Sequence, residues 1–257
     1  MNPLPEGVKG KIRWAEHHLK LIDEQVAWYG EDDPHYIRAE IDLSIPGYLV
    51  HLRTRKPPLA LALMVGDFFQ NLRNSLDHLA RGLVEATGGT PVDGAGGTQF
   101  PITDRTLNPP VIRGMNPTCA AYAEIERRVK DLQPTSAADR PLIWFIREFA
   151  NIDKHQTLQF PTGAGTSSNM SADIIDPVNH VVFLGPCYTD QEIARLGVPN
   201  PPPRPEIRVN GTFTTFVYLP ELWQASGQPL TELVPGLAAF LNVVREDIVS
   251  EFLEFFG

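Results

Sequence analysis

Cysteine is scarce in this chain. Only Cys119 and Cys187 occur among its 257 residues, which excludes a disulfide framework and a zinc site built from cysteines. Long apolar runs are also lacking: no stretch approaches the roughly 18 uninterrupted apolar residues of a membrane span. The opening residues, MNPLPEGVKG, lack the apolar core of a secretory signal. We therefore expect a cytoplasmic protein with no membrane contact.

Basic residues are outnumbered by acidic ones. The chain has 22 lysines and arginines against 31 aspartates and glutamates, a formal net charge of −9. Proteins that coat nucleic acids depend on neutralising phosphates and are usually basic. The acidic balance argues against a general DNA or RNA coat, while leaving room for a local basic site. Two catalytic signatures are absent as well, the phosphate-binding Gly-x-x-x-x-Gly-Lys-Ser/Thr loop and the Gly-x-Ser-x-Gly nucleophile turn.

Apolar residues recur at steps of three and four in several segments, a spacing typical of amphipathic helices. Leu72, Leu76, Leu79 and Leu83 give one such stripe. The segment 88–116 is rich in Gly, Pro and Asn and is predicted to be a long loop. With the end signals added, we predict a helical core from residues 8–29, 58–86, 117–158 (in two pieces, divided at Gln133-Pro134) and 231–256.

Two parts of the chain alternate apolar and polar residues, as strands do. Residues 36–55 contain two such runs around Ser44-Ile45-Pro46-Gly47 and predict a β-hairpin. Within 173–219, an Asn210-Gly211 pair between two β-rich runs suits a type I′ turn and predicts another hairpin. The fold class we predict is α+β, a single domain over residues 1–257 in which antiparallel hairpins pack alongside a helical bundle.

Two of the predicted helices carry similar polar stripes. The stripe of the first comprises Asp67, Asn71, Asn74 and His78, and that of the second comprises Glu148, Asn151 and His155. Each contains Asn-x-x-x-His, which places an amide and an imidazole one turn apart. Such an amide can fix the imidazole's tautomer, and a neutral imidazole can move protons near pH 7. Three interpretations stay open: two walls of one site, two solvated polar faces, or a buried Asn/His network that links the two helices.

One motif overlaps the first stripe. Arg73-Asn74-Ser75-Leu76-Asp77-His78 is an arginine, a polar residue, three further residues and a histidine. It resembles the RxxxxH motif of the HEPN superfamily, where Asn, Asp or His commonly follows the arginine. That superfamily consists of helical bundles that often dimerise. Many members are metal-independent ribonucleases, and others are non-catalytic.

The resemblance implies a role for each motif residue. Arg73 would steady the scissile phosphate, since a guanidinium matches phosphate geometry. His78 would act on the ribose 2′-OH or the leaving oxygen, and Asn74 would help to hold the site. Cleavage would need no metal or other cofactor and would leave a 2′,3′-cyclic phosphate. The matching Arg and His of a second subunit would complete the site.

We therefore expect an HEPN-like RNA-cleaving or RNA-binding protein that forms a homodimer. Its catalytic residues would be Arg73, Asn74 and His78, and its binding wall would comprise Asn71, Asp77, Glu148, Asn151 and His155. On a straight helix Arg73 and His78 lie ~140° apart, whereas Asp77 is one turn from Arg73 and well placed to pair with it.

Two alternatives stay open. The first is a non-catalytic helical interaction protein in which the Asn and His stripes are structural. The second is a metal-dependent bundle enzyme in which His17 or His18, His78 and His155 converge with Asp67 or Glu148. No His-Glu-x-x-His motif supports the second alternative.

Overall fold

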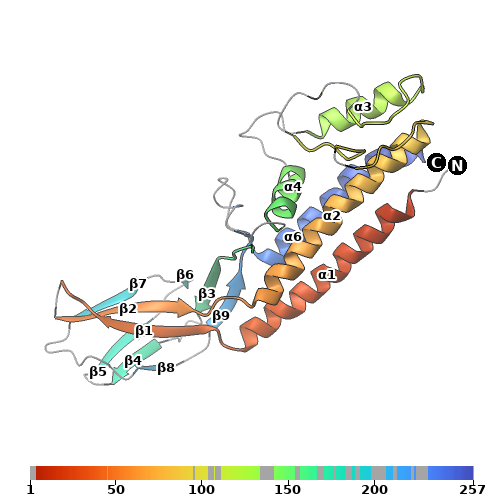
Figure 1. Ribbon diagram of the computed structural model, residues 1–257. Coiled ribbons are helices and arrows are strands. Elements are labelled where there is room, and N and C mark those ends of the chain that lie inside the picture. The colour runs from red at the N-terminus through yellow and green to blue at the C-terminus, as the bar shows by residue number, and fades with distance from the viewer. Residues whose placement is uncertain are drawn as a thin grey trace. The chain divides into compact units, whose positions relative to one another are not determined.

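The computed structural model combines helices and antiparallel strands (Figure 1). It describes residues 4–44, 46–94, 96–103, 107, 111–133, 142–153, 157–166, 171–175, 178–182, 187–188, 192–197, 207–210, 213–220, 223 and 231–256. They fall into two compact units. The helical unit takes its residues from 1–23, 62–158 and 234–257, and the strand unit from 24–61 and 159–233. The α+β class is confirmed, while a single domain over 1–257 stays a prediction.

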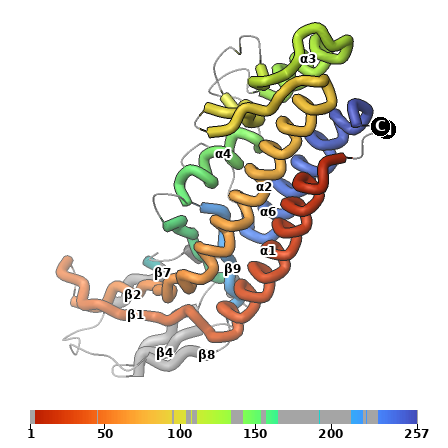
Figure 2. The backbone as a smooth tube through the Cα atoms, turned by 45° about the vertical axis from the view of Figure 1, so that its right-hand side comes forward, coloured from red at the N-terminus to blue at the C-terminus, as the bar shows by residue number. Residues whose placement is uncertain are grey.

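The helical unit is built on two long antiparallel helices, α1 (Glu6–Glu31) and α2 (Leu59–Ala86), of which residues 6–23 and 62–86 belong to it. The others are α3 (Tyr122–Asp131), α4 (Leu142–Asp153) and α6 (Leu233–Asn242), with α6 continued by the π-helical η1 (Val243–Val249) and the 3-10 helix η2 (Ser250–Phe255). In both views α1, α2 and α6 lie side by side (Figures 1 and 2). None of the described helices is long and apolar enough to cross a membrane.

Aromatic side chains join three of these helices. Phe69 of α2 lies 4.6 Å from Phe149 of α4 and 5.2 Å from Phe240 of α6, measured between ring centroids. All three side chains are fully buried. Burying an aromatic ring is worth about 1.5–3 kcal/mol, and tilted or edge-on ring pairs add to that. This cluster therefore fixes the distance between α2 and α4, the two helices that carry the predicted polar stripes.

The helix predictions for 8–29 and 58–86 are confirmed, and 231–256 is helical from Leu233 onwards. The prediction of a helix from residue 117 is wrong, since 117–121 form turns and α3 begins at Tyr122. The reason is local: Oδ1 of Asn116 accepts hydrogen bonds from the backbone N–H and the hydroxyl of Thr118. Such bonds favour a turn over a helix. Residues 142–153 form α4 within the predicted range, whereas 157 and 158, predicted to be helical, are not. The segments 134–141 and 154–156 lie outside the described residues.

In the strand unit, β1 (His35–Ile41) and β2 (Gly47–Thr54) form an antiparallel hairpin, as predicted for 36–55. On its far side β2 pairs with β7 (Glu192–Gly197). A second sheet has the order β6-β3-β9, and a third has the order β5-β4-β8. Their strands are β3 (Thr162–Thr166), β6 (Cys187–Tyr188), β9 (Phe213–Val217), β4 (Ser171–Ile175), β5 (Val178–Val182) and β8 (Ile207–Asn210).

The hairpin predicted around Asn210-Gly211 is wrong. β8 pairs with β4, and β9 pairs with β3 in a different sheet. An Asn-Gly pair favours a tight turn only locally. Here each flanking strand pairs with an antiparallel partner from another part of the chain, and strand pairing depends on those side-chain contacts more than on the turn.

A buried histidine links strands that are far apart in the sequence. Only 5% of His35 is exposed. Its Nδ1 lies 2.9 Å from Oγ1 of Thr54 on β2, and its Nε2 lies 3.0 Å from Oγ1 of Thr215 on β9. Burial lowers the pKa of His35, although the charge of Asp33 acts in the opposite direction. The imidazole is therefore held neutral at pH 7 between two hydroxyl groups.

We expect the protein to lose stability as the pH falls below about 6.5, the ordinary histidine pKa. His35 binds a proton less readily when folded than when unfolded, so the unfolded state gains protons first and the free energy of unfolding decreases. Burial lowers the pKa of His18 as well, which acts in the same direction. The measurement is the urea midpoint between pH 7.5 and 5.

The variant His35→Gln isolates the contribution of this side chain, because Gln retains hydrogen-bonding capacity but does not titrate. Its midpoint should depend less steeply on pH than that of the wild-type protein, with the remaining slope carried in part by His18. Parallel pH curves for the two proteins would contradict the assignment.

Candidate functional site

An open cavity of about 700 Å³ lies in the helical unit, beside α2, α4 and the loop segment Gln99–Thr103. We call it the Arg73 cavity. It has the size of many small-molecule sites. The described residues that line it are Gln70, Arg73, Asn74 and Asp77 of α2, Arg147 and Asn151 of α4, and Gln99, Phe100, Pro101, Ile102, Thr103 and Leu107 of the loop.

A largely buried ion pair forms one wall. Nη2 of Arg73 lies 2.9 Å from Oδ1 of Asp77, with 15% and 28% of the two side chains exposed. This is the one-turn pairing that the helical spacing favours. The same Oδ1 accepts the backbone N–H of Phe100 at 3.0 Å. One carboxylate therefore orients the guanidinium and fixes the loop over it.

The Arg73 guanidinium keeps unused hydrogen-bonding capacity. Its Nη1 is buried and has no hydrogen-bond partner among the described residues. Burial lowers the pKa of Arg73, and the nearby charge of Arg147 lowers it further, while Asp77 opposes both effects. Arginine still remains protonated at any physiological pH. A buried cation with an unpaired donor is costly, and an incoming anion would relieve that cost.

Arg147 of α4 contributes charge and fixes the loop. Its Nη1 donates to the carbonyl of Ile102 at 2.6 Å, and its Nε and Nη2 each lie 2.8 Å from Oε1 of Glu148. Its guanidinium also lies 5.8 Å from the centroid of the Trp144 ring. Arg147 is thus held in place by its partners, whereas Arg73 has a free donor. Glu148, predicted as a binding residue, serves to hold Arg147.

Side chains from α3 and its C-terminal end hold the rest of the loop. Oε1 of Glu126 accepts the N–H of Val111 at 3.0 Å, and Oε1 of Gln133 accepts the N–H of Thr103 at 3.0 Å. Both acceptors are buried, with 6% and 9% exposed. These loop residues belong to no helix or strand. The two side-chain acceptors therefore supply hydrogen-bond partners for backbone N–H groups that would otherwise be buried without one.

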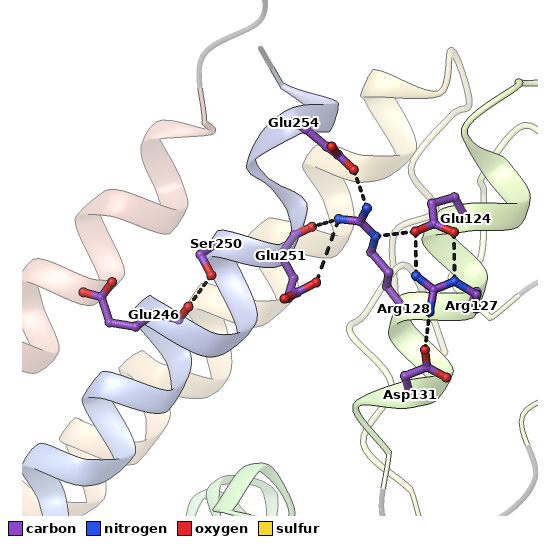
Figure 3. A network of polar contacts seen from close by, with 8 residues as sticks. All are labelled: Glu124, Arg127, Arg128, Asp131, Glu246, Ser250, Glu251 and Glu254. Atoms are coloured by element: carbon purple, nitrogen blue, oxygen red, sulfur yellow. Dashed lines mark hydrogen bonds and ion pairs between the residues drawn. The ribbon is translucent and has the colours of Figure 1, made fainter.

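The α3 helix is in turn attached to the C-terminal 3-10 helix η2 (Figure 3). Nε of Arg128 lies 2.7 Å from Oε1 of Glu124, and its Nη2 lies 2.5 Å from Oε1 of Glu254. Its Nη1 donates to the carbonyl of Glu251, and its guanidinium lies 5.1 Å from the Phe255 ring centroid. Several bonds to one planar cation give a defined geometry, so α3 has a fixed place from which to hold the loop.

Two asparagines predicted as site residues lie at the same cavity. Asn74 comes from α2 and Asn151 from α4, and both line the Arg73 cavity. Asn74 is half-buried and Asn151 is exposed. Neither carboxamide hydrogen bonds to a described residue, whereas the amide of the neighbouring Gln70 donates to the carbonyl of Ala150. One amide from each predicted stripe therefore lines the Arg73 cavity.

The histidine of the motif lies elsewhere. His78 is not among the residues that line the cavity. A Cβ placed on Gly7 of α1 would lie 2.5 Å from Nδ1 of His78, so the ring packs directly on that glycine. Asn71 also turns toward α1, where its Oδ1 lies 3.3 Å from Nζ of Lys11. Arg73 and His78 of one chain thus occupy different faces of α2, as the ~140° separation predicts.

The other predicted histidine, His155, lies outside the described residues. Among the described residues, no group of three His, Cys, Asp or Glu side chains could hold a metal ion. Asp67, named in the metal alternative, interacts electrostatically with Asp153 of α4 and with His18 of α1. Burial and the charge of Asp67 raise the pKa of Asp153, and burial lowers the pKa of His18, although Asp67 acts against that shift.

Sequence reasoning missed Gln70, Arg147 and the loop segment Gln99–Thr103 as parts of the site. Arg147 carries no distinguishing spacing, because its importance comes from contacts with a loop some 45 positions away. Comparison with protein-family models, curated proteins and solved structures finds no match for this chain. The HEPN resemblance therefore stays a hypothesis that rests on residues 73–78.

Replacing Asp77 by Asn should lower the free energy of unfolding by about 1–3 kcal/mol, because it leaves Arg73 buried without a counter-charge. Urea denaturation measures this directly. In the double variant Arg73→Gln/Asp77→Asn the loss should be smaller than the sum of the two single losses, since neither residue is then an uncompensated charge.

The matched control is Glu85→Gln on the same helix. Arg81 and Glu85 have the same spacing as Arg73 and Asp77, but their closest atoms are 3.7 Å apart and their side chains are 47% and 60% exposed. Its effect should stay within about 0.5 kcal/mol. Equal losses for Asp77→Asn and Glu85→Gln would show that burial of the Arg73 pair has no energetic consequence.

Proposed function

We propose that this protein is an HEPN-like RNA-binding protein that holds a phosphate group of RNA at Arg73. The observation that carries the proposal is the buried Nη1 of Arg73, which has no partner among the described residues and belongs to a side chain that lines an open cavity. A guanidinium forms its strongest hydrogen bonds with phosphate and carboxylate oxygens. The RxxxxH resemblance at residues 73–78 favours RNA as the source of the phosphate.

The charges around the cavity support an anionic ligand. Two guanidinium groups, Arg73 and Arg147, and one carboxylate, Asp77, line it. Arg147 is paired with Glu148 and donates to the Ile102 carbonyl, so Arg73, with its unpaired Nη1 donor, is the cation that would contact the ligand. A single phosphate contact is compatible with a chain of net charge −9, because it needs no extended basic surface.

The proposal is for binding rather than for cleavage within one chain. A general base must lie within hydrogen-bond reach of the 2′-OH, directly or through one water. His78 packs on Gly7, away from the residues that line the cavity. Cleavage at Arg73 would require an imidazole from a second copy of the chain, which is what the HEPN resemblance implies for a dimer.

A homodimer is the second part of the proposal. On α1 and α2 of the helical unit, 57% of Trp14 and 56% of Leu63 are exposed. Exposed apolar side chains that form a contiguous patch are typical of surfaces that associate, and we assign these two side chains to such a patch. Light scattering should give the mass of a dimer for the wild-type protein and a lower mass for Trp14→Glu. A monomeric wild-type protein would contradict this part and leave RNA binding to be judged separately.

RNA binding is tested by fluorescence anisotropy with a labelled single-stranded RNA in the presence of EDTA. Arg73→Gln should weaken binding about tenfold or more, the value of one charged hydrogen-bond pair. The plot of log K against log salt should also lose about 0.7 of slope, the contribution of one phosphate on a single strand. Circular dichroism confirms that the variant is folded.

Arg81→Gln is the matched control, since Arg81 lies on the same helix but pairs with Asp93 at 2.9 Å and does not line the cavity. It should bind RNA as the wild-type protein does. The proposal fails if the wild-type protein binds no RNA, or if Arg73→Gln and Arg81→Gln have equal affinities. A gel of the same samples shows whether the RNA stays intact, and any cleavage should be absent in His78→Ala.

A further inference from the structure

The Arg73 cavity contains two carboxamide groups that no contact explains. Asn74 and Asn151 come from different helices, line the same cavity, and make no hydrogen bond with a described residue. Their neighbour Gln70 differs, because its amide donates to the Ala150 carbonyl and so joins α2 to α4. Each free carboxamide presents a carbonyl acceptor beside an N–H donor.

That pair of groups complements one edge of a nucleobase. An amide of Asn or Gln forms two hydrogen bonds with an acceptor and a donor that lie side by side, as N7 and the N6 amino group of adenine do. Adenine repeats this pattern on its Watson–Crick edge, with N1 beside the same amino group, which has one hydrogen for each edge. The Hoogsteen edge of guanine presents two acceptors, N7 and O6, and the pyrimidines lack a Hoogsteen N7.

We infer that Asn74 and Asn151 read an adenine of the bound RNA, one on each edge of the base, beside the phosphate held by Arg73. This inference rests on the function proposed above. Arg73 contacts phosphate and gives affinity for any sequence, whereas the two amides contact a base and give selectivity. The Gln70–Ala150 bond joins the two helices that carry the amides, so the backbone positions of Asn74 and Asn151 are set relative to one another before the base arrives.

The test uses short oligouridines that carry one central A, C, G or U. The wild-type protein should bind the adenine-containing RNA about tenfold or more tightly than the others, the discrimination expected of a bidentate contact. Asn74→Ala and Asn151→Ala should each reduce this preference and leave the salt slope unchanged. Asn242→Ala is the control, since Asn242 lies on α6 and outside the cavity lining.

Base analogues separate the two edges. The 7-deaza analogue of adenine lacks the Hoogsteen acceptor, and the 1-deaza analogue lacks the Watson–Crick acceptor. Each should weaken binding to the wild-type protein. In each single Ala variant, the RNA that carries one of the two analogues should bind as tightly as the RNA that carries adenine. The reason is that the amide which contacts the altered edge has been removed.

The outcomes distinguish this inference from the proposed function. If the RNA does not bind, or binds independently of Arg73, the proposed function itself fails. If binding depends on Arg73 but the four oligonucleotides bind equally, the adenine assignment is overturned and the RNA-binding function stands. An adenine preference that persists in both Ala variants also overturns the assignment, since another part of the protein would then read the base.

Discussion

The hydrogen bonds and ion pair made by the Asp77 carboxylate are the interaction on which the site depends. The carboxylate accepts from Nη2 of Arg73 at 2.9 Å and from the backbone N–H of Phe100 at 3.0 Å. The first contact stabilises the Arg73 cation where water has little access. The second holds the loop segment that shields this cation from water. Charge-assisted bonds of this kind are stronger than neutral ones, and they strengthen further as water is excluded. The Asp77 carboxylate therefore sets both the position of the Arg73 guanidinium and its burial.

The loop follows the same principle along its length. A segment without helix or sheet must still pair its buried amide groups. Here side chains of Glu126, Gln133 and Arg147 supply the partners, and Arg128 secures α3, from which the first two extend. The cost of burying these polar side chains is offset only while the loop is in place. The loop part of the cavity wall is consequently held in a defined position although it has no regular secondary structure.

Particular elements show which parts of the fold and of the site can be predicted from the sequence. The apolar stripe of Leu72, Leu76 and Leu79 predicts α2, and the spacing of Arg73 and Asp77 predicts their pairing, since both depend on neighbours within one helix. β3 was not expected, because its Gly-Ala-Gly centre has low strand propensity and its pairing with β9 brings together residues some 50 positions apart. The partners of the loop are distant in the same way. Contacts between segments that are far apart in the chain produce no periodic pattern in the sequence, so they could not be predicted from it.

The division of the polar stripe on α2 has a simple geometric origin. Asn74 and His78 are one turn apart, but four residues advance about 40° beyond a full turn, and Asn71 lies about 60° from Asn74 on the same side as His78. Asn74 therefore lines the Arg73 cavity, whereas Asn71 and His78 face α1, where Gly7 leaves room for the His78 ring. A motif counted along the sequence thus spans two surfaces of one helix. Its arginine and its asparagine serve the cavity, and its histidine serves the packing of α1 on α2.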